Sequence, residues 1–463
     1  MKNFKKLHAP FAAFAVFAML VTTGAGCGGP SEAELAANDP VTITIWRVFD
    51  DDSTFTETMN AYREIHKNVS FDYRTLRYEE YQDELLRALA EGNGPDVFSI
   101  NNGWIGQYES LILPLPKTLS IPYTEIRGTI KKETVVTLKE EPAMTVRELE
   151  TNFVDAVADD VVRDYQPNPK QEAEKRIFGI PLSVDTLALF YNKDLFNAAS
   201  IAEAPKTWTE FQEDVTKLTT IGADDAIVQS GAAIGTSRNV ERAFDVLSLL
   251  MMQNGTVMAD SRGAATFGNE LDDNSLPGAD AVRFYTEFAN PLKSVYAWND
   301  AQPSSFDAFT SGKAAMFLGY SYHVPLIRAR SPKLSFGVAP IPQISSGRTV
   351  NYANYWVETV SKSTKNPNWA WDFVQFASEA EQVDTYLAAA GKPTALRSLI
   401  NAQLQDDDLS TFAGQLFTAK SWYLGNDAAV AESAFLELID ATIKGGELER
   451  LIRDAQNKVN QTL

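Results

Sequence analysis

The chain has 463 residues, of which 44% are hydrophobic and 22% are charged, so it can bury large cores and is not a disordered polyelectrolyte. Its formal net charge is -20 and its pI is about 4.7. This acidity argues against nucleic acids and anionic membrane surfaces as partners, because both would repel the chain. The length allows two or three domains, and the charge favours a partner that is small and either neutral or cationic.

The first 26 residues predict a signal peptide, which we leave out of the fold. Three lysines precede an apolar stretch over residues 9–21 that is too short to span a bilayer as a mature helix. Small residues then lead to Cys27, the only cysteine, so the chain cannot build a disulfide framework. Residues 27–40 are small, polar and acidic, which predicts a flexible tether.

The first expected element is a strand over residues 41–49, because apolar side chains alternate along VTITIWRVF. An acidic turn and a helix over residues 55–66 follow. Ligands sit at the carboxyl ends of strands in open α/β sheets, so Trp46, Asp50 and Asp51 are candidate rim residues. The acids lack the spacing of a calcium loop. We expect them to cap the helix and to bind ligand hydroxyls.

Two further strands, over residues 69–73 and 96–100, enclose a helix over residues 78–91. Asn102 and Trp104 lie in the loop after the third strand, again at a carboxyl end. Trp104 either reaches the ligand or closes the lobe as a half-buried side chain.

Residues 117–177 are rich in charge and threonine, and they show helical spacing across residues 148–165. We expect a helix there, with Leu149, Phe153 and Val157 on its apolar face. No motif assigns this segment a function. It is either an element of the cleft rim or a plain surface elaboration.

Residues 178–196, FGIPLSVDTLALFYNKDLF, alternate in two runs whose phase shifts at Asp185 and Thr186. Asn192 then caps a helix that begins near Leu195. We interpret the shift as a crossing between two lobes, with Asp185 facing the cleft. The other interpretation is that Asp185 only accepts hydrogen bonds from turn amides.

The second half of the chain continues to alternate strands and helices. A capping box at Thr207 and Glu210 opens one helix. Asn366-Pro367 opens another, whose Trp371 we expect in the core. The remaining expected elements are strands over 231–235, 314–318 and 354–362, helices over 240–253 and 277–288, and an extended return to the first lobe over 334–342.

Five segments resemble extracellular solute-binding protein family 1, the maltose-binding-protein-like sugar receptors of ABC importers. The crossing over 178–196 is the most specific, through its Ile-Pro, the acid four residues after Pro181, and the run Tyr-Asn-Lys-Asp-Leu. The other segments are GPDVFSINNGWIGQY (94–108), PKTWTEF (205–211), SFDAFTSGKAAMFLGYSY (305–322), and NYWVETVSK with NPNWAWDFVQFASEAEQ (354–362 and 366–382).

The resemblance implies an α/β, two-lobe periplasmic-binding-protein-like fold of type II. Mixed central sheets would be flanked by helices, and the ligand cleft would lie between the lobes. The N-terminal lobe would contain residues 41–181 and 332–379. The C-terminal lobe would contain residues 182–331 and 380–463.

The resemblance also implies a binding site. The family places an aromatic side chain, usually tryptophan, where Tyr320 and Tyr322 stand here. Aromatic faces would stack on sugar C–H groups, and the candidates are Trp46, Trp104, Tyr320, Tyr322 and Trp356. Carboxylates and amides would bind hydroxyls, and the candidates are Asp50, Asp51, Asn102, Asp185 and Asn354.

The expected function is capture of a mono- or oligosaccharide by lobe closure and its delivery to the permease of an ABC importer. The chain would be a monomer and no enzyme, with no cofactor, no metal and no nucleic-acid partner. Cys27 resembles a bacterial lipoprotein site, which would anchor the protein by lipid to the membrane outside the cytoplasm. Otherwise an ordinary signal peptide leaves a free thiol at Cys27.

Other function classes stay open at this point. A secreted carbohydrate-active enzyme needs only two carboxylates, and the chain has 61 acids. An adhesin is a further class, and a receptor for a polyol or glycerol phosphate would share the fold. HExxH, GxSxG and Walker motifs are absent from the sequence.

Overall fold

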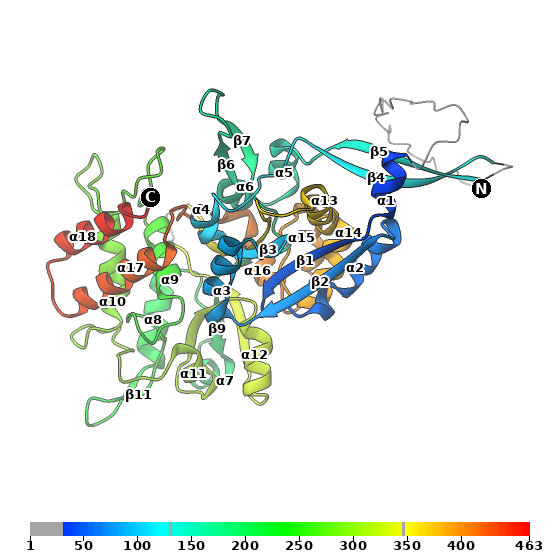
Figure 1. The fold of residues 1–463 in the computed structure, drawn as a ribbon. Coiled ribbons are helices and arrows are strands. Elements are labelled where there is room, and N and C mark those ends of the chain that lie inside the picture. The colour runs from blue at the N-terminus through cyan, green and yellow to red at the C-terminus, as the bar shows by residue number, and fades with distance from the viewer. Residues whose placement is uncertain (1–30, 130–131, 345–347) are drawn as a thin grey trace, which may run out of the picture.

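The computed structural model describes residues 31–129, 132–344 and 348–463, so the predicted signal peptide and Cys27 lie outside the described residues. Two hydrophobic cores form the body of the molecule, each around a sheet flanked by helices (Figure 1). The expected two-lobe α/β architecture is confirmed. None of the helices in the described residues is long and apolar enough to cross a membrane.

The first lobe is built on four strands: β1 (Val41–Val48), β2 (Val69–Leu76), β3 (Val97–Asn101) and β15 (Trp356–Val360). Their order in the sheet is β15-β3-β1-β2. β1 pairs parallel with β2 and β3, whereas β15 arrives from late in the chain and pairs antiparallel with β3. The carboxyl ends of β1 and β3 therefore meet the start of β15 at one edge of the sheet.

Three predicted helices flank this sheet: α2 (Asp52–Ile65), α3 (Tyr78–Glu91) and α13 (Pro367–Ala377). The helices that follow, α14 (Ala380–Ala390), α15 (Arg397–Gln403) and α16 (Ser410–Gln415), were not predicted, and α16 contacts β8 and β13. Three short helical pieces accompany them: η1 (Asn102–Trp104), α4 (Ile105–Tyr108) and η2 (Leu416–Thr418). α2 begins earlier than predicted because the Asp51 side chain accepts a hydrogen bond from the Ser53 N–H. Trp371 in α13 is fully buried, as expected.

A long hairpin of β4 (Thr118–Arg127) and β5 (Glu133–Pro142) occupies the first part of the 117–177 segment. It projects from the first lobe, away from the second lobe (Figure 1). α1 (Glu32–Asn38) packs against both strands. The prediction of a flexible tether over 27–40 is therefore wrong at α1, whose start carries a capping box of Ser31 and Glu34 that we overlooked.

The rest of this segment contains two helices and two strands: α5 (Val146–Asn152), α6 (Asp155–Val161), β6 (Val162–Tyr165) and β7 (Glu174–Ile177). The single helix predicted over 148–165 is therefore wrong. The Val154 N–H donates to the Ala395 carbonyl at 3.1 Å, and this bond interrupts the helix between α5 and α6. The predicted apolar residues are still buried, so periodicity identified the buried face but not the break.

The second lobe is built on three antiparallel strands: β9 (Ala188–Asn192), β12 (Met316–Gly319) and β13 (Phe336–Pro340). Their order is β12-β9-β13. We predicted that 334–342 returns to the first lobe, but the pairing of β13 with β9 places it in the second. Residues 231–235 form no regular strand, although the Ala233 N–H donates to the Met316 carbonyl at 2.9 Å.

Eight helices and a small ribbon complete the described part of the second lobe: α7 (Lys193–Ala198), α8 (Trp208–Leu218), β10 (Thr220–Ile221), β11 (Ile227–Gln229), α9 (Ala243–Gln253), α10 (Pro277–Glu287), α11 (Ser305–Thr310), α12 (His323–Arg330), α17 (Ala428–Ile443) and α18 (Leu448–Asn460). α8 begins with the predicted capping box of Thr207 and Glu210.

Three short strands join the lobes: β8 (Asp185–Thr186), β14 (Asn351–Asn354) and β16 (Ala419–Lys420). They pair in the order β16-β14-β8, and we call them the hinge sheet. The chain changes core at each strand: between Val184 and Leu187, between Tyr352 and Ala353, and between Ala419 and Trp422. The last two changes fall later than our boundaries at 332 and 380, because β13 stays in the second lobe and α14 packs on α2 in the first.

Candidate functional site

A cavity of about 570 Å³ lies between the two lobes, a volume within the range of small-molecule sites. The first lobe, the second lobe and the hinge sheet all contribute side chains to it. Eight of the ten residues predicted to bind ligand line this cavity: Asp50, Asn102, Trp104, Asp185, Tyr320, Tyr322, Asn354 and Trp356.

Trp46 and Asp51 do not line the cavity. Trp46 is buried, and the Arg74 guanidinium lies 5.0 Å from its ring centre. Side chains alternate along β1, so the next residue, Arg47, takes the cavity side instead. Asp51 serves as the N-cap of α2. The first correction moves the prediction by one residue, to Arg47, and the second leaves Asp50, which was also predicted, as the acid that lines the cavity.

Four aromatic side chains of the first lobe, which we call the aromatic wall, line the cavity: Phe49, Tyr78, Trp104 and Trp356. The ring centres of Phe49 and Tyr78 are 5.7 Å apart and those of Tyr78 and Trp104 are 6.3 Å apart, both in stacked geometry. The Trp356 ring lies at 87° to Phe49 and at 69° to Trp104. Trp104 and Trp356 were predicted from the sequence, whereas Phe49 and Tyr78 were not.

Phe49 has a strained backbone for so large a side chain. Its φ is 70°, in the left-handed region, and its side chain is 65% exposed. Non-glycine residues with such backbone angles are uncommon and concentrate at ligand sites. Phe49 directly follows β1, so the rule that ligands sit at carboxyl ends of strands could have identified it.

Tyr320 and Tyr322 both follow β12, but they face different surroundings. Tyr320 is buried, and its hydroxyl donates to Asp245 Oδ2 at 2.5 Å. Tyr322 is 44% exposed, and its ring centre lies 4.2 Å from that of His323. Tyr322 therefore presents an exposed ring to the cavity and stacks on Tyr320 with ring centres 6.0 Å apart, whereas the Tyr320 hydroxyl holds Asp245 in place.

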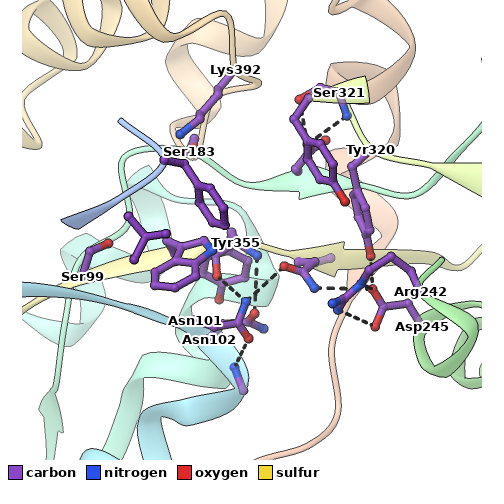
Figure 2. Close-up of a pocket in the computed structure, with 18 of the residues that line it drawn as sticks. Ser99, Asn101, Asn102, Ser183, Arg242, Asp245, Tyr320, Ser321, Tyr355 and Lys392 are labelled. Carbon is purple, nitrogen blue, oxygen red and sulfur yellow. Dashed lines mark hydrogen bonds and ion pairs between the residues drawn. The ribbon is translucent and has the colours of Figure 1, made fainter. Parts of the chain in front are cut away.

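Asp245 is the centre of a polar network on the second lobe (Figure 2). Arg242 binds this carboxylate through two nitrogens, at 2.7 and 3.0 Å. Asn354 Nδ2 donates to it at 3.4 Å, and Asn354 Oδ1 accepts from Asn101 Nδ2 at 3.1 Å. Asn354 thus links the second lobe to the end of β3. No sequence motif marked Arg242 or Asp245.

Asp185 lies in the hinge sheet, opposite Asn354. It accepts hydrogen bonds from the Ser321 N–H at 2.9 Å, the Ser321 hydroxyl at 2.6 Å and the Thr186 N–H at 2.8 Å. Burial raises the pKa of Asp185 to about 7, although these donors oppose the shift. Asp185 therefore faces the cavity, as expected, and the alternative that it only accepts hydrogen bonds from turn amides is wrong, although it does accept from the Thr186 and Ser321 amides.

A buried ion cluster lies on the first-lobe side of the cavity. Arg47 contacts Asp50 and Glu358, each at 3.1 Å. Lys392 Nζ donates to both Asp50 oxygens, at 2.6 and 2.8 Å, and the Tyr386 hydroxyl donates at 2.9 Å. Burial would raise the pKa of Asp50, but Arg47 and Lys392 hold that pKa below its usual value. Arg47 and Lys392 line the cavity and were not predicted from the sequence.

Asn102 lines the cavity, but its amide is held from behind. Asn102 Nδ2 donates to Asp160 Oδ2 at 2.9 Å, and Asn102 Oδ1 accepts from the Tyr355 N–H at 3.4 Å. Asp160 also accepts hydrogen bonds from the Tyr355 and Ser421 hydroxyls. Burial raises the pKa of Asp160 to about 6. A ligand hydroxyl that binds Asn102, as predicted, would therefore compete with Asp160 and the Tyr355 N–H for the Asn102 amide.

The cavity offers flat aromatic faces together with polar groups that both donate and accept hydrogen bonds. This combination suits a ligand with apolar faces and a polar edge. Within residues 31–129, 132–344 and 348–463, no group of three or more His, Cys, Asp or Glu side chains is placed to hold a metal ion.

We predict that Asp185→Asn changes how stability depends on pH. The pKa of Asp185 is raised from its ordinary 3.8 to about 7, so the folded chain binds more protons than the unfolded chain between about pH 4 and pH 7. The free energy of unfolding should therefore fall as pH rises through this window. In the variant, the fall between pH 5 and pH 7.5 should be smaller by about 1–2 kcal/mol, as measured by urea unfolding. Asp160 and Asp372, with pKa values also raised to about 6, contribute equally to both chains. Identical pH slopes for the two chains would contradict the prediction.

A family model described as "Bacterial extracellular solute-binding protein" matches residues 57–411. A protein of Brucella abortus (strain 2308) that is named as a binding protein is 26% identical over 208 residues, which cover 43% of this chain and 46% of that protein. The chain thus matches about half the length of this relative.

Two further similarities extend over more of the chain. The maltodextrin-binding protein MdxE of Bacillus subtilis (strain 168) is 24% identical over 313 residues, which cover 65% of this chain and 67% of that one. Among solved structures, the cyclic alpha-maltosyl-1,6-maltose binding protein from Arthrobacter globiformis superposes with a TM-score of 0.68. It shares 17% identity, and the match covers 91% of this chain and 98% of that one.

Proposed function

Because the chain belongs to the family of bacterial extracellular solute-binding proteins, we propose that it captures a carbohydrate between its lobes and delivers it to an ABC importer. One observation carries the choice of a carbohydrate. The cavity sets an aromatic wall on the first lobe and the exposed ring of Tyr322 on the second beside polar groups that can bind hydroxyls. Sugar rings have apolar C–H faces and hydroxyl edges, so both kinds of surface find a partner.

Capture works through closure of the lobes about the hinge sheet. Trp356 and Tyr322 lie on different lobes, so a ligand touches both fully only when the lobes close around it. The ligand then biases the lobes toward the closed form, which the permease recognises. Asp185 and Asn354, in the hinge sheet itself, bind ligand hydroxyls. The chain makes and breaks no covalent bond.

The relatives support a ligand longer than one ring. Two of the proteins described above are named for binding maltodextrin and cyclic maltosyl-maltose. The cavity of about 570 Å³ accommodates a small oligosaccharide. We place the protein outside the cytoplasm, held at the membrane by lipid on Cys27.

A thermal-shift screen of the purified mature chain tests the proposal. The panel contains mono- and oligosaccharides, polyols, glycerol phosphate and polyamines. A true ligand at 100 times its dissociation constant should stabilise the fold by about 2.7 kcal/mol. A sugar that raises the melting temperature and is recovered unchanged supports a receptor. A sugar that is consumed indicates an enzyme, and stabilisation only by a polyamine or glycerol phosphate overturns the carbohydrate assignment.

A further inference from the structure

One carboxylate of the 117–177 segment joins three separate pieces of the cavity wall. Asp160 in α6 is 2% exposed and accepts hydrogen bonds from Asn102 Nδ2 at 2.9 Å and the Tyr355 hydroxyl at 2.6 Å. It also accepts one from the Ser421 hydroxyl. All three donors line the cavity, whereas Asp160 does not. Asp160 therefore acts on the site from behind, through its donors.

Two of these donors directly follow strands of the hinge sheet. Tyr355 comes after β14, and Ser421 comes after β16. Ser421 lies between Ala419, which is in the first core, and Trp422, which is in the second. The bond from Ser421 to Asp160 thus ties a crossing segment to the first lobe at the point where the chain leaves it. Figure 2 shows Asn102 and Tyr355 side by side at this wall.

The hydrogen bonds of Asp160 act as a geometric constraint on the three donors. Its three donors are neutral, so no formal charge on a donor offsets the cost of burying the carboxylate. Burial raises the pKa of Asp160, and the neighbouring Asp159 raises it further. Buried polar groups in this situation hold their partners tightly, because any partner that moves away leaves an unsatisfied group behind.

We propose that Asp160 is a positioning residue for lobe closure, which clamps two of the three crossing segments to the first lobe and so limits the range of lobe angles. This gives the 117–177 segment a role at the site without contact to ligand. The inference rests on the proposed capture of ligand by closure. When the lobe angle varies over a narrow range, ligand binding loses less conformational entropy in fixing that angle.

The test measures the distance between lobes in the absence of ligand, so it does not depend on the outcome of the ligand screen. Cys27→Ser removes the only cysteine, after which Ile65→Cys and Leu292→Cys each accept a spin label. Ile65 is 50% exposed in the first lobe, and Leu292 is 92% exposed in the second. Pulsed electron-spin resonance on the full mature chain then gives the distribution of distances between the lobes.

Asp160→Asn should widen this distribution by about 1.5-fold or more, because the amide cannot accept all three hydrogen bonds. The matched control is Asp372→Asn. Asp372 also accepts a tyrosine hydroxyl in the first lobe, from Tyr62 at 2.6 Å, but it lies away from the hinge sheet and the cavity. The control should lower stability without widening the distribution.

Ser421→Ala keeps the test decisive if Asp160→Asn fails to fold. It removes one donor from a crossing segment and should produce part of the widening. In combination with Asp160→Asn it should add little, because the two changes break the same contact. An unchanged width in Asp160→Asn and Ser421→Ala, or equal widening in the Asp372→Asn control, would overturn the proposal.

Discussion

Replacing Arg47 by alanine should lower the free energy of unfolding by about 3–5 kcal/mol, the range seen when one partner of a buried ion pair is removed. The Arg47 side chain is 3% exposed and lies 3.1 Å from both Asp50 and Glu358. Its guanidinium also lies 4.3 Å from the Phe55 ring centre. Lys392 remains beside Asp50 after the substitution, but Glu358 loses the cation that contacts it.

Urea unfolding at pH 7 measures this loss, and Arg74→Ala is the matched control. Arg74 belongs to the same sheet and also packs on an aromatic ring, but it is exposed. Its removal should cost at most about 1 kcal/mol. The deficit of Arg47→Ala should shrink at pH 4.5, because burial raises the pKa of Glu358 and a protonated Glu358 no longer needs a cation. A deficit no larger than that of Arg74→Ala would refute the structural role of Arg47.

Trp356→Ala should weaken binding of the carbohydrate identified in the thermal screen by about 100-fold, or about 2.7 kcal/mol. Trp356 borders the cavity and packs at right angles against Phe49 and close to the Trp104 ring. The substitution removes one flat face and loosens the rest of the aromatic wall. Isothermal titration calorimetry would measure the affinity.

Trp369→Ala separates loss of the binding surface from general damage to the first lobe. Trp369 is half-buried on α13, and its ring lies 5.1 Å from that of His66, away from the cavity. This variant should lose stability but keep its affinity. If both tryptophan variants bind as tightly as the parent chain, the aromatic wall is not the ligand site.

Strand ends were the most predictable part of the site. Asp50, Trp104 and Trp356 each lie next to an end of β1, β3 or β15, and all three elements were predicted close to their observed bounds. The direction of individual side chains was harder. β1 is buried on both faces over most of its length, so alternation of apolar residues could not tell whether Trp46 or Arg47 faces the cavity.

The polar cavity residues that were not predicted were missed for a different reason. Arg242 directly precedes α9, and Lys392 directly follows the C-cap of α14. In a sequence, isolated charges of this kind look like ordinary solvated surface. Only the approach of distant segments turns them into cavity residues. The same limit applies to the helix predicted over 148–165, because its interruption depends on Ala395, a contact across more than two hundred residues.

The late arrival of β15 has a consequence for how the protein folds. The edge of β3 stays unpaired until residues 356–360 have been made, and the second core stays open until α17 and α18 are present. Neither lobe is a contiguous stretch of chain that can mature while the other is still being synthesised. Folding therefore depends on long-range contacts in both lobes, which favours slow folding. A fragment ending at residue 340 would expose an unpaired strand edge and an incomplete core, and it would aggregate rather than persist as a single lobe.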